Sequence, residues 1–369
     1  MMNPPPESGD MAKIMVAMSG GVDSAVTALL LQKLGYEVYG LHLLLHEDSE
    51  VDAALLDCCC QLNIPLTVRD CRENFFSRVL MPGAAEYARG RTPNPCCECN
   101  AALKFYELFA AADEAGIALV ATGHYVQMEH CGDDVKIVPA ADQSKDQSYF
   151  LYRLSAGQLR RCVFPLGKYS KGEVRAIAAE NSLICASRPD SQDACFQVPG
   201  ECCGNTLSRL CRLSGKRGRF IYQGKNVGRH SGIHAFTIGQ RQGLGVALGV
   251  PAYIKRIDPD KGDIFLCTDQ NELLCRRFAV TRVVWQRGYA PAPEEKFMVR
   301  VRYRTAGKEC TFCSSGGDTG FVTLDTAQRA VTPGQAAVFY DLSGALLGGG
   351  VISLEETESR SESENSHPQ

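Results

Sequence analysis

The chain has 369 residues, of which 45% are hydrophobic and 22% are charged, and its formal net charge is −3. This length allows two or three domains with separate cores, and the composition is typical of a globular protein. No apolar run approaches the ~20 residues of a membrane span, and the first ten residues lack a signal-peptide pattern. We therefore expect a cytoplasmic protein without a membrane partner. Eighteen cysteines in such a chain favour buried or reactive thiols over a disulfide framework.

A glycine-rich turn near the N-terminus is the strongest local signal. An apolar run over 13–18 leads into Ser19-Gly-Gly-Val-Asp-Ser24, and apolar residues at helical spacing follow over 25–34. Two glycines allow close backbone approach, and the free N–H groups of a helix start attract anions, so the turn predicts phosphate binding. The lysine of the common P-loop is missing. The alternative is a plain strand–helix turn in which Asp23 or Ser24 caps the helix.

The rest of the chain divides into segments that differ in hydrophobic pattern and composition. Strand-like runs over 14–18, 38–45, 66–68 and 117–122 alternate with amphipathic segments, which predicts an α/β domain with an open parallel sheet and ligands at the carboxyl ends of its strands. Residues 200–265 indicate a small, irregular α+β or β domain, and 266–354 a C-terminal antiparallel β-barrel. The predicted boundaries are a disordered leader over 1–11, the α/β domain over 12–199, the two later domains, and a disordered tail over 355–369.

Three cysteines stand apart from the others, which we expect to be mostly buried apolar side chains. Cys96-x-x-Cys99 lies beside two prolines, and Cys195 lies in the distant segment DSQDACF. A Cys-x-x-Cys turn brings two thiols to one partner, which can be a disulfide, a zinc ion or an iron–sulfur cluster. Two ordinary loop thiols are the alternative. Basic residues over 209–229, together with Arg300, Arg302 and Arg304, can provide local nucleic-acid surfaces despite the negative net charge. Arg302 and Arg304 alternate along the predicted strand FMVRVRYR, 297–304, so an ordinary exposed strand face is the alternative for these two.

A family resemblance now joins these signals. The SGGVDS segment resembles the PP-loop of the ATP pyrophosphatases. The segments TPNPC-x-x-CN, ATGHY, DQSYFL, FPLGKYSKGEVR, DSQ-x-x-CF, FTIGQRQGLG and PGQAAVFYD follow it in order, and together they resemble the bacterial tRNA-specific 2-thiouridylases over about 13–353. The resemblance implies a PP-loop catalytic domain that uses ATP and Mg²⁺ to adenylate the C2 oxygen of the wobble uridine. Sulfur then replaces that oxygen in the tRNAs for Lys, Glu and Gln.

The resemblance also implies roles for individual residues. The residues implied to bind ATP are Ala17, Met18, Ser19, Gly20, Gly21, Val22, Asp23, Ser24, Leu43 and Gly123. Those implied to lie at the target base are Asn94, Pro95 and Cys96, and those implied to touch tRNA are His124, Lys145, Asp146, Gln147, Arg302, Tyr303 and Gln335. Cys99 aligns with the nucleophile and Cys195 with the cysteine that carries a persulfide.

Two sulfur routes remain open at this point. In one, Cys195 receives sulfane sulfur from a donor (a cysteine desulfurase or a sulfur-relay protein) and Cys99 releases it, by way of a disulfide. In the other, Cys96, Cys99 and Cys195 hold a 4Fe–4S cluster whose free iron holds sulfide, so that inorganic sulfide can be the donor. Many relatives carry an acidic residue where this chain has Cys96, and the segment His42-Leu-Leu-Leu-His46 also departs from the usual pattern. The rival functions are a PP-loop ligase or amidotransferase acting on a small metabolite, and a non-catalytic tRNA-binding or iron–sulfur protein.

Overall fold

The computed structural model describes residues 11–47, 50–132, 134–189 and 194–353. The predicted leader (apart from residue 11), the predicted tail over 355–369 and the DSQ triplet at 190–192 therefore lie outside the described residues. No helix in the described ranges is long and apolar enough to cross a bilayer.

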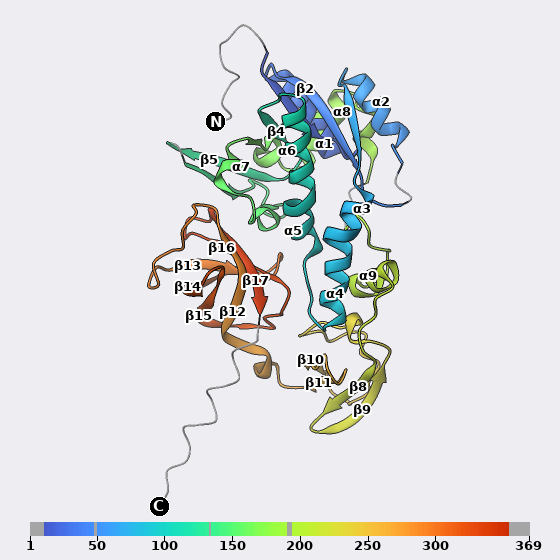
Figure 1. Cartoon of the computed structure of the whole chain (residues 1–369), viewed down its shortest axis with the longest axis vertical. Coiled ribbons are helices and arrows are strands. Elements are labelled where there is room, and N and C mark those ends of the chain that lie inside the picture. The colour runs from blue at the N-terminus through green and yellow to red at the C-terminus, as the bar shows by residue number, and fades with distance from the viewer. Residues whose placement is uncertain (1–10, 48–49, 133, 190–193, 354–369) are drawn as a thin grey trace, which may run out of the picture.

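The first domain is built on a parallel sheet of five strands in the order β3-β2-β1-β4-β7. The strands are β1 Lys13–Ala17, β2 Glu37–Leu44, β3 Leu66–Asp70, β4 Leu119–Ala121 and β7 Cys162–Val163. The flanking helices are α1 Val22–Lys33, α2 Ala53–Gln61, α6 Phe105–Glu114 and α8 Lys171–Glu180 (Figure 1). The predicted parallel sheet with helices is confirmed, because buried apolar runs of strand length alternate with helical segments along this part of the chain.

Two further features extend the first domain. After β3 the chain runs through α3 Arg72–Phe75, the π-helix η1 Phe76–Leu80 and α4 Met81–Ala88; it then returns through α5 Pro95–Cys99 and a second π-helix, η2 Asn100–Lys104. Figure 1 shows α4 reaching from the sheet towards the next domain, with α9 Cys203–Cys211 beside it. The remaining elements are the hairpin β5 Val126–Cys131 and β6 Asp134–Pro139, then η3 Ser148–Leu151, α7 Ala156–Leu159, η4 Pro165–Lys168 and η5 Ile184–Ser187.

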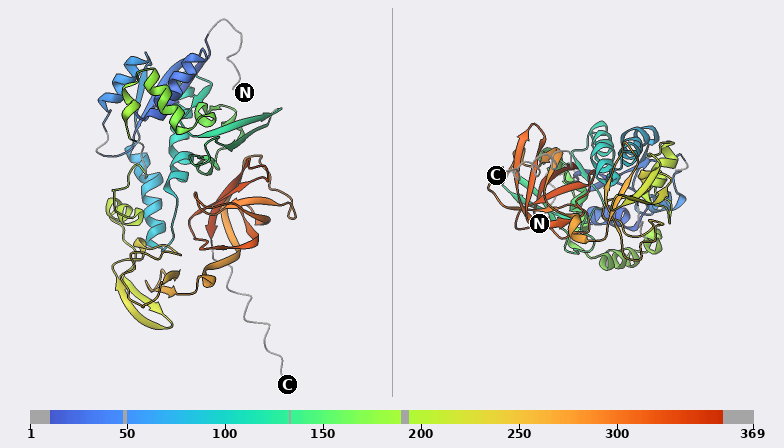
Figure 2. Two further views of the ribbon diagram at one scale, coloured as in Figure 1. Left: turned by 180° about the vertical axis from the view of Figure 1, so that it is seen from behind. Right: turned by 90° about the horizontal axis from the view of Figure 1, so that it is seen from below.

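Two β-structures follow. The central sheet has the order β10-β11-β8-β9, and its strands are β8 Gly218–Tyr222, β9 Lys225–His230, β10 Tyr253–Ile257 and β11 Ile264–Cys267, with η6 Ile233–Ala235 between β9 and β10. After η7 Gln270–Leu273 comes a closed antiparallel barrel, as predicted. Its strands are β12 Leu274–Trp285, β13 Phe297–Arg300, β14 Lys308–Gly316, β15 Thr319–Arg329, β16 Ala336–Tyr340 and β17 Leu346–Ser353. Seen from behind in Figure 2, the barrel lies beside the first domain and the central sheet forms the far end.

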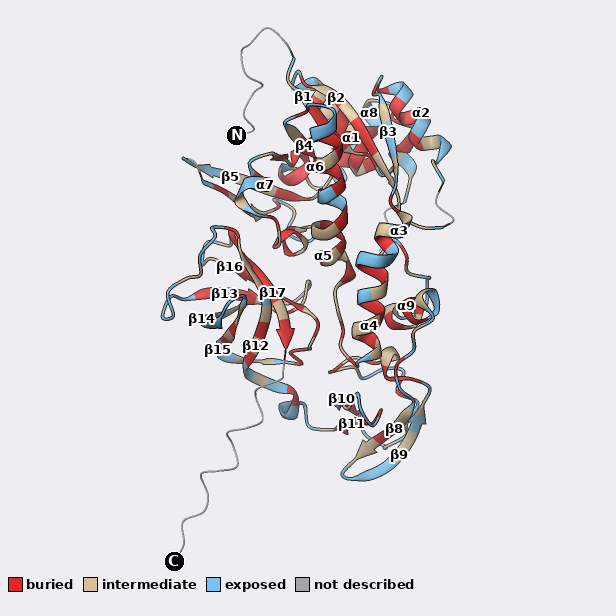
Figure 3. Ribbon diagram, in the orientation of Figure 1, coloured by how far each residue is buried: buried red, intermediate tan, exposed pale blue. Residues whose placement is uncertain are grey.

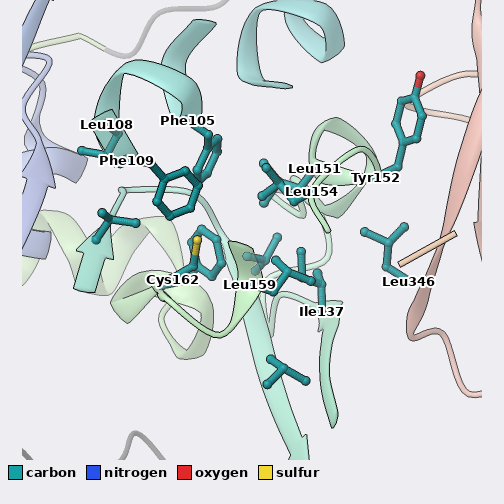
Figure 4. Packing of buried hydrophobic residues seen from close by; sticks show 14 of the residues in the cluster. Phe105, Leu108, Phe109, Ile137, Leu151, Tyr152, Leu154, Leu159, Cys162 and Leu346 are labelled. Atoms are coloured by element: carbon teal, nitrogen blue, oxygen red, sulfur yellow. The ribbon is translucent and has the colours of Figure 1, made fainter. Parts of the chain in front are cut away.

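The first domain and the barrel share one hydrophobic core. Phe105 and Phe109 of α6, Tyr152 and the barrel residues Val338 and Leu346 belong to a single buried cluster, part of which is drawn in Figure 4. Figure 3 shows that buried segments run through the parallel sheet and through the barrel strands. Burial of apolar surface between the two domains holds the barrel in a defined position against the first domain.

Candidate active site

The glycine-rich turn lies between β1 and α1, as the sequence predicts. Gly20 has φ +80°, a value that favours glycine. Gly21 is the N-cap residue of α1, so neither Asp23 nor Ser24 caps this helix. Ser24 Oγ instead donates to the Gly21 carbonyl at 3.0 Å and accepts from the Ser19 N–H at 3.2 Å, which fixes the turn from inside. A helix of 12 residues that starts without a side-chain cap offers its first N–H groups to an anion.

A partly buried ion pair joins this turn to α8. Lys171 Nζ lies 2.7 and 2.8 Å from the two carboxylate oxygens of Asp23, and the Tyr125 hydroxyl donates to the same carboxylate at 2.7 Å. Gly123 also packs against Asp23, since a Cβ at this glycine would lie 3.1 Å from the Asp23 carbonyl carbon. The sequence motif FPLGKYSKGEVR contains Lys171, but its role becomes visible only in the fold.

The residues predicted to bind ATP therefore gather at the carboxyl ends of β1, β2 and β4. Ala17 ends β1, and Leu43 lies one residue before the end of β2. The Met18 N–H donates to the Leu41 carbonyl at 2.7 Å, and His42 Nδ1 lies 2.7 Å from the Met18 carbonyl. These bonds hold the start of the turn against β2. Parallel α/β sheets bind ligands at this edge.

The three predicted thiols lie together, as one cluster. Asn94 caps α5 by accepting from the N–H groups of Cys96 and Cys97 at 3.2 and 3.3 Å, with Pro95 at the first helical position. Cys99 is buried, Cys96 is partly buried and Cys195 is exposed, and all three are free thiols. Cys99 packs in the same hydrophobic cluster as Phe196, the residue after Cys195. We call Cys96, Cys99 and Cys195 the thiol cluster.

Without a nearby positive charge, the surroundings of the thiol cluster disfavour ionised thiolates. Burial raises the pKa of Cys99 to about 12, with further increases from Cys195 and Cys96, while the positive charge of Lys104 opposes them. Desolvation by the surrounding protein also raises the pKa values of Cys96 and Cys195, although the Cys195 side chain still reaches solvent, and Lys104 again opposes the increase. In the described ranges, no three or more His, Cys, Asp or Glu side chains are arranged to hold a metal ion. The iron–sulfur expectation thus finds no support in the geometry.

His124 connects the two halves of the site. It follows Gly123, and its ring stacks on Phe105 with 5.8 Å between the ring centroids. Its Nδ1 lies 2.8 Å from the Thr122 hydroxyl. Burial, reinforced by Lys104, lowers the pKa of His124 to about 3, so the imidazole is neutral at physiological pH. It can exchange hydrogen bonds with a base but offers no charge to a phosphate.

Glu98 anchors the thiol-bearing helix to the barrel, a feature that the sequence did not reveal. Its carboxylate lies 2.6 Å from the Arg153 guanidinium and 2.7 Å from that of Arg282 on β12. Burial opposes ionisation, but both arginines favour it, and the net effect lowers the pKa of Glu98. Glu98 and Arg282 are 184 residues apart in the sequence, so no local sequence pattern predicts their contact.

Two of the residues predicted to touch tRNA, Asp146 and Tyr303, line a pocket of about 290 Å³ between the first domain and the barrel. It is lined by Gln143, Ser144, Asp146, Arg300, Tyr303, Arg304, Thr305 and Ala306. Asp146 is buried and accepts from Ser148 Oγ at 2.8 Å and from Arg300 at 3.3 Å. The neighbouring Gln147 accepts from the Tyr125 N–H at 2.9 Å. Lys145, which is partly buried, belongs to the same loop.

Arg302 and Gln335 make structural contacts. The strand predicted through Arg302 and Arg304 is wrong, because β13 ends at Arg300 and both residues lie in the following turn. Arg302 Nη2 donates to the Ile238 and Ala330 carbonyls at 3.0 and 3.1 Å and to Thr332 Oγ1 at 2.6 Å. Gln335 Nε2 donates to the Thr92 carbonyl at 2.8 Å, two residues before the Asn94 cap.

Comparison with known proteins agrees with this architecture over nearly the whole chain. Three family models match: a tRNA methyl transferase HUP domain over 12–199, a tRNA methyl transferase PRC-barrel domain over 210–268 and an aminomethyltransferase β-barrel domain over 275–352. A solved 4-thiouridine synthetase–RNA complex with bound ATP is 17% identical with a TM-score of 0.37, covering 55% of this chain and 49% of that one.

Curated relatives match at higher identity. The tRNA-specific 2-thiouridylase MnmA of Syntrophotalea carbinolica is 41% identical over 351 residues, covering 92% of this chain and 98% of the relative. Proteins of the same name from Syntrophomonas wolfei and a Roseiflexus species are 40% and 39% identical, with 99% of each relative covered and 92% and 93% of this chain. With its nucleotide-type turn, its thiol cluster and all three domain models in order, the chain belongs to the MnmA family of tRNA-specific 2-thiouridylases.

Proposed function

We propose that this protein is an ATP-dependent sulfurtransferase that converts the wobble uridine of the tRNAs for Lys, Glu and Gln to 2-thiouridine in the cytoplasm. One observation carries the proposal: a continuous line of contacts leads from the glycine-rich turn to the thiols. Gly123 packs on Asp23 of the turn, and the adjacent His124 stacks on Phe105. Phe105 directly follows Lys104, whose charge acts on all three thiols. A uracil base held between the turn and the thiols would be within reach of both the ATP phosphates and the sulfur.

The first half-reaction is activation of the base. The C2 oxygen of uracil is a poor leaving group and must be activated before sulfur can replace it. The oxygen attacks the α-phosphate of ATP, displaces pyrophosphate and becomes part of an AMP ester, from which AMP can leave. The turn from Ser19 to Ser24 and the start of α1 would hold the departing pyrophosphate. ATP would enter as its magnesium complex. The Asp23 carboxylate is already paired with Lys171, so the phosphates and water would supply ligands that Mg²⁺ needs.

The second half-reaction is sulfur transfer. Cys195, the exposed thiol, would receive sulfane sulfur from a donor and become a persulfide. The terminal sulfur of that persulfide attacks C2 and displaces AMP. Cys99 then attacks the Cys195 sulfur, which releases the thiolated base and leaves a Cys99–Cys195 disulfide for an external dithiol to reduce. We derive no step through an iron–sulfur cluster, because the described residues do not form a metal-binding group.

The test is a thiolation assay with ATP, tRNA and a persulfide donor, scored as 2-thiouridine per enzyme. We expect Cys99→Ser and Cys195→Ser to lose thiolation and Cys96→Ala to keep most of it. Cys313→Ser, which alters an exposed thiol on the barrel strand β14, is the matched control and should behave as the unaltered protein. Activity in Cys195→Ser equal to that of the control would overturn the persulfide assignment. Loss of iron together with activity in Cys96→Ala would favour the cluster instead.

Isotope exchange between pyrophosphate and ATP distinguishes the rival functions. A tRNA thiolase of this kind should show exchange that depends on tRNA, since the tRNA base is the group that is adenylated. Exchange driven by a small metabolite without tRNA would indicate a ligase or amidotransferase. The absence of exchange under both conditions would indicate a tRNA-binding protein without catalytic activity.

A further inference from the structure

Lys104 is a charged residue in the site for which the proposed reaction gives no role. It ends the π-helix η2, which follows the Cys99 helix directly, and the Phe105 N–H there bonds to the Asn100 carbonyl five residues back. In a regular α-helix a side chain five residues after Cys99 would point about 140° away around the axis. The wider π turn, with its i→i+5 bonds, returns Lys104 towards the face that carries Cys99.

The electrostatic surroundings of Lys104 agree with this geometry. Its positive charge opposes the raised pKa values of Cys96, Cys99 and Cys195 and helps to lower that of His124, as expected for a cation on the Cys99 face of the π turn. The side chain keeps solvent access. Among the described residues, no carboxylate forms an ion pair with it. The acidic residue of the thiol-bearing helix, Glu98, is bound to two arginines instead.

The other charged or titratable groups around the cluster do not replace this cation. His124 is neutral at physiological pH. Burial raises the pKa of Cys203 on α9 to about 11, so this neighbouring thiol is uncharged at physiological pH. Lys104 is therefore the positive charge, within the described part of the chain, that the thiol cluster faces.

We infer that Lys104 is an anion-binding residue that holds the persulfide anion of Cys195 during sulfur transfer to the tRNA base. This inference rests on the proposed function and assigns a residue to its sulfur step. A lysine ammonium is a compact point charge with three donors, which suits a small anion without fixed geometry. Lys104 forms no covalent bond and gives up no proton in this role. It stabilises negative charge at the place where the buried surroundings disfavour it.

The inference can be tested without tRNA or ATP. Cys195 is alkylated with iodoacetate, which is an anion, or with iodoacetamide, which is neutral, and the modified peptide is quantified by mass spectrometry. Both reagents attack the same thiolate, so the ratio of their rates cancels the ionised fraction of the thiol. The ratio reports how strongly the site attracts an anion. The exposed Cys313 on the barrel provides an internal reference in the same molecule.

We expect Lys104→Met to lower the iodoacetate/iodoacetamide ratio at Cys195 about fivefold or more, as removal of a nearby unit charge should at an effective dielectric constant of ~20. Lys104→Arg should preserve the ratio. Lys33→Met is the matched control, because Lys33 is exposed on α1 and bonded to Asn181, and it should change nothing. If Lys104→Met does not fold, Lys104→Gln replaces it.

An unchanged ratio in Lys104→Met would overturn the inference. If tRNA affinity were weakened in the same variant, Lys104 would instead be a phosphate contact. Failure of tRNA thiolation in the unaltered protein would refute the proposed function but leave the alkylation ratio as an independent result. In the thiolation assay itself, Lys104→Met should lower kcat while the KM for tRNA stays nearly constant.

Discussion

Replacing Glu98 by Gln should destabilise the protein by about 2 kcal/mol, through loss of the bridge between the thiol-bearing helix and the barrel. Glu98 and Arg153 have side chains that are 27% and 23% exposed, while Arg282 is 52% exposed. A largely buried hydrogen bond to a charged group contributes about 1.5–3 kcal/mol, and the more exposed second pair about 0.5 kcal/mol. The glutamine oxygen can still accept a hydrogen bond from one of the two arginines. The expected loss of stability therefore lies within the range of about 1.5–3 kcal/mol given for the largely buried bond.

Urea unfolding at pH 7 measures this loss, and Glu86→Gln is the matched control. Glu86 has 26% exposure and also faces two arginines, Arg89 and Arg91, but at 3.4 and 3.5 Å and within its own segment. We expect the control to lose less than about 0.5 kcal/mol. The first domain and the barrel share one core, so the loss should appear in a common unfolding transition. A Glu98→Gln variant no less stable than the control would refute the bridge.

The same variant has a defined pH dependence. The pKa of Glu98 is lowered in the folded protein, below the ordinary glutamate value of about 4.3. A lowered carboxyl pKa gives stability that is fully present above the unfolded-state pKa and is lost as the pH falls through the folded-state value. The stability difference between the unaltered protein and Glu98→Gln should therefore be constant near neutral pH and shrink under acid conditions. A difference that grows as the pH falls would contradict the assigned ion pair.

Two further predictions concern other contacts of the site. Lys171→Met and Asp23→Ala should each abolish tRNA-dependent pyrophosphate exchange while tRNA affinity changes less than about threefold. The reason is that the turn binds phosphates whereas other surfaces position tRNA. Exchange at the unaltered rate in either variant would refute the role of the turn. Arg302→Ala should lower the unfolding midpoint and leave the salt dependence of tRNA binding unchanged, because its guanidinium is bonded to Ile238, Ala330 and Thr332; a flatter salt slope would instead support the predicted tRNA contact.

The parts of the fold that depend on local patterns could be predicted from the sequence. Apolar runs of strand length located β1 to β4, and the glycine-rich turn followed β1 as expected. The strand proposed through Arg302 and Arg304 was wrong, although its residues alternate suitably. The Arg302 N–H bonds to Thr305 Oγ1 and the Thr305 N–H to the Arg302 carbonyl, so a tight turn replaces the strand. Such local competition between turn and strand is not visible in side-chain periodicity.

The family motifs marked residues that the fold brings together, but the charged contacts between distant segments were missed. Cys99 and Cys195 come together although 95 residues separate them in the sequence, because Phe196 packs into the cluster that holds Cys99. Nothing in the local sequence of Glu98 indicates that Arg282 will reach it. The roles of Lys104 and Lys171 were missed for a similar reason: a lysine near a motif has no distinguishing pattern until its neighbours are known.

The contacts of Thr92 have a consequence for how the protein is made. The Thr92 N–H donates to the Pro333 carbonyl at 2.8 Å, its carbonyl accepts from Gln335, and its hydroxyl donates to Thr237 at 3.0 Å. Residues from the last-synthesised domain thus hold the segment that leads into the cysteine helix. At roughly 5–20 residues per second on the ribosome, on the order of ten to fifty seconds pass between synthesis of Cys99 and of Gln335. During that interval the segment that leads into the cysteine helix lacks the bonds to Pro333 and Gln335 that hold it in the finished protein.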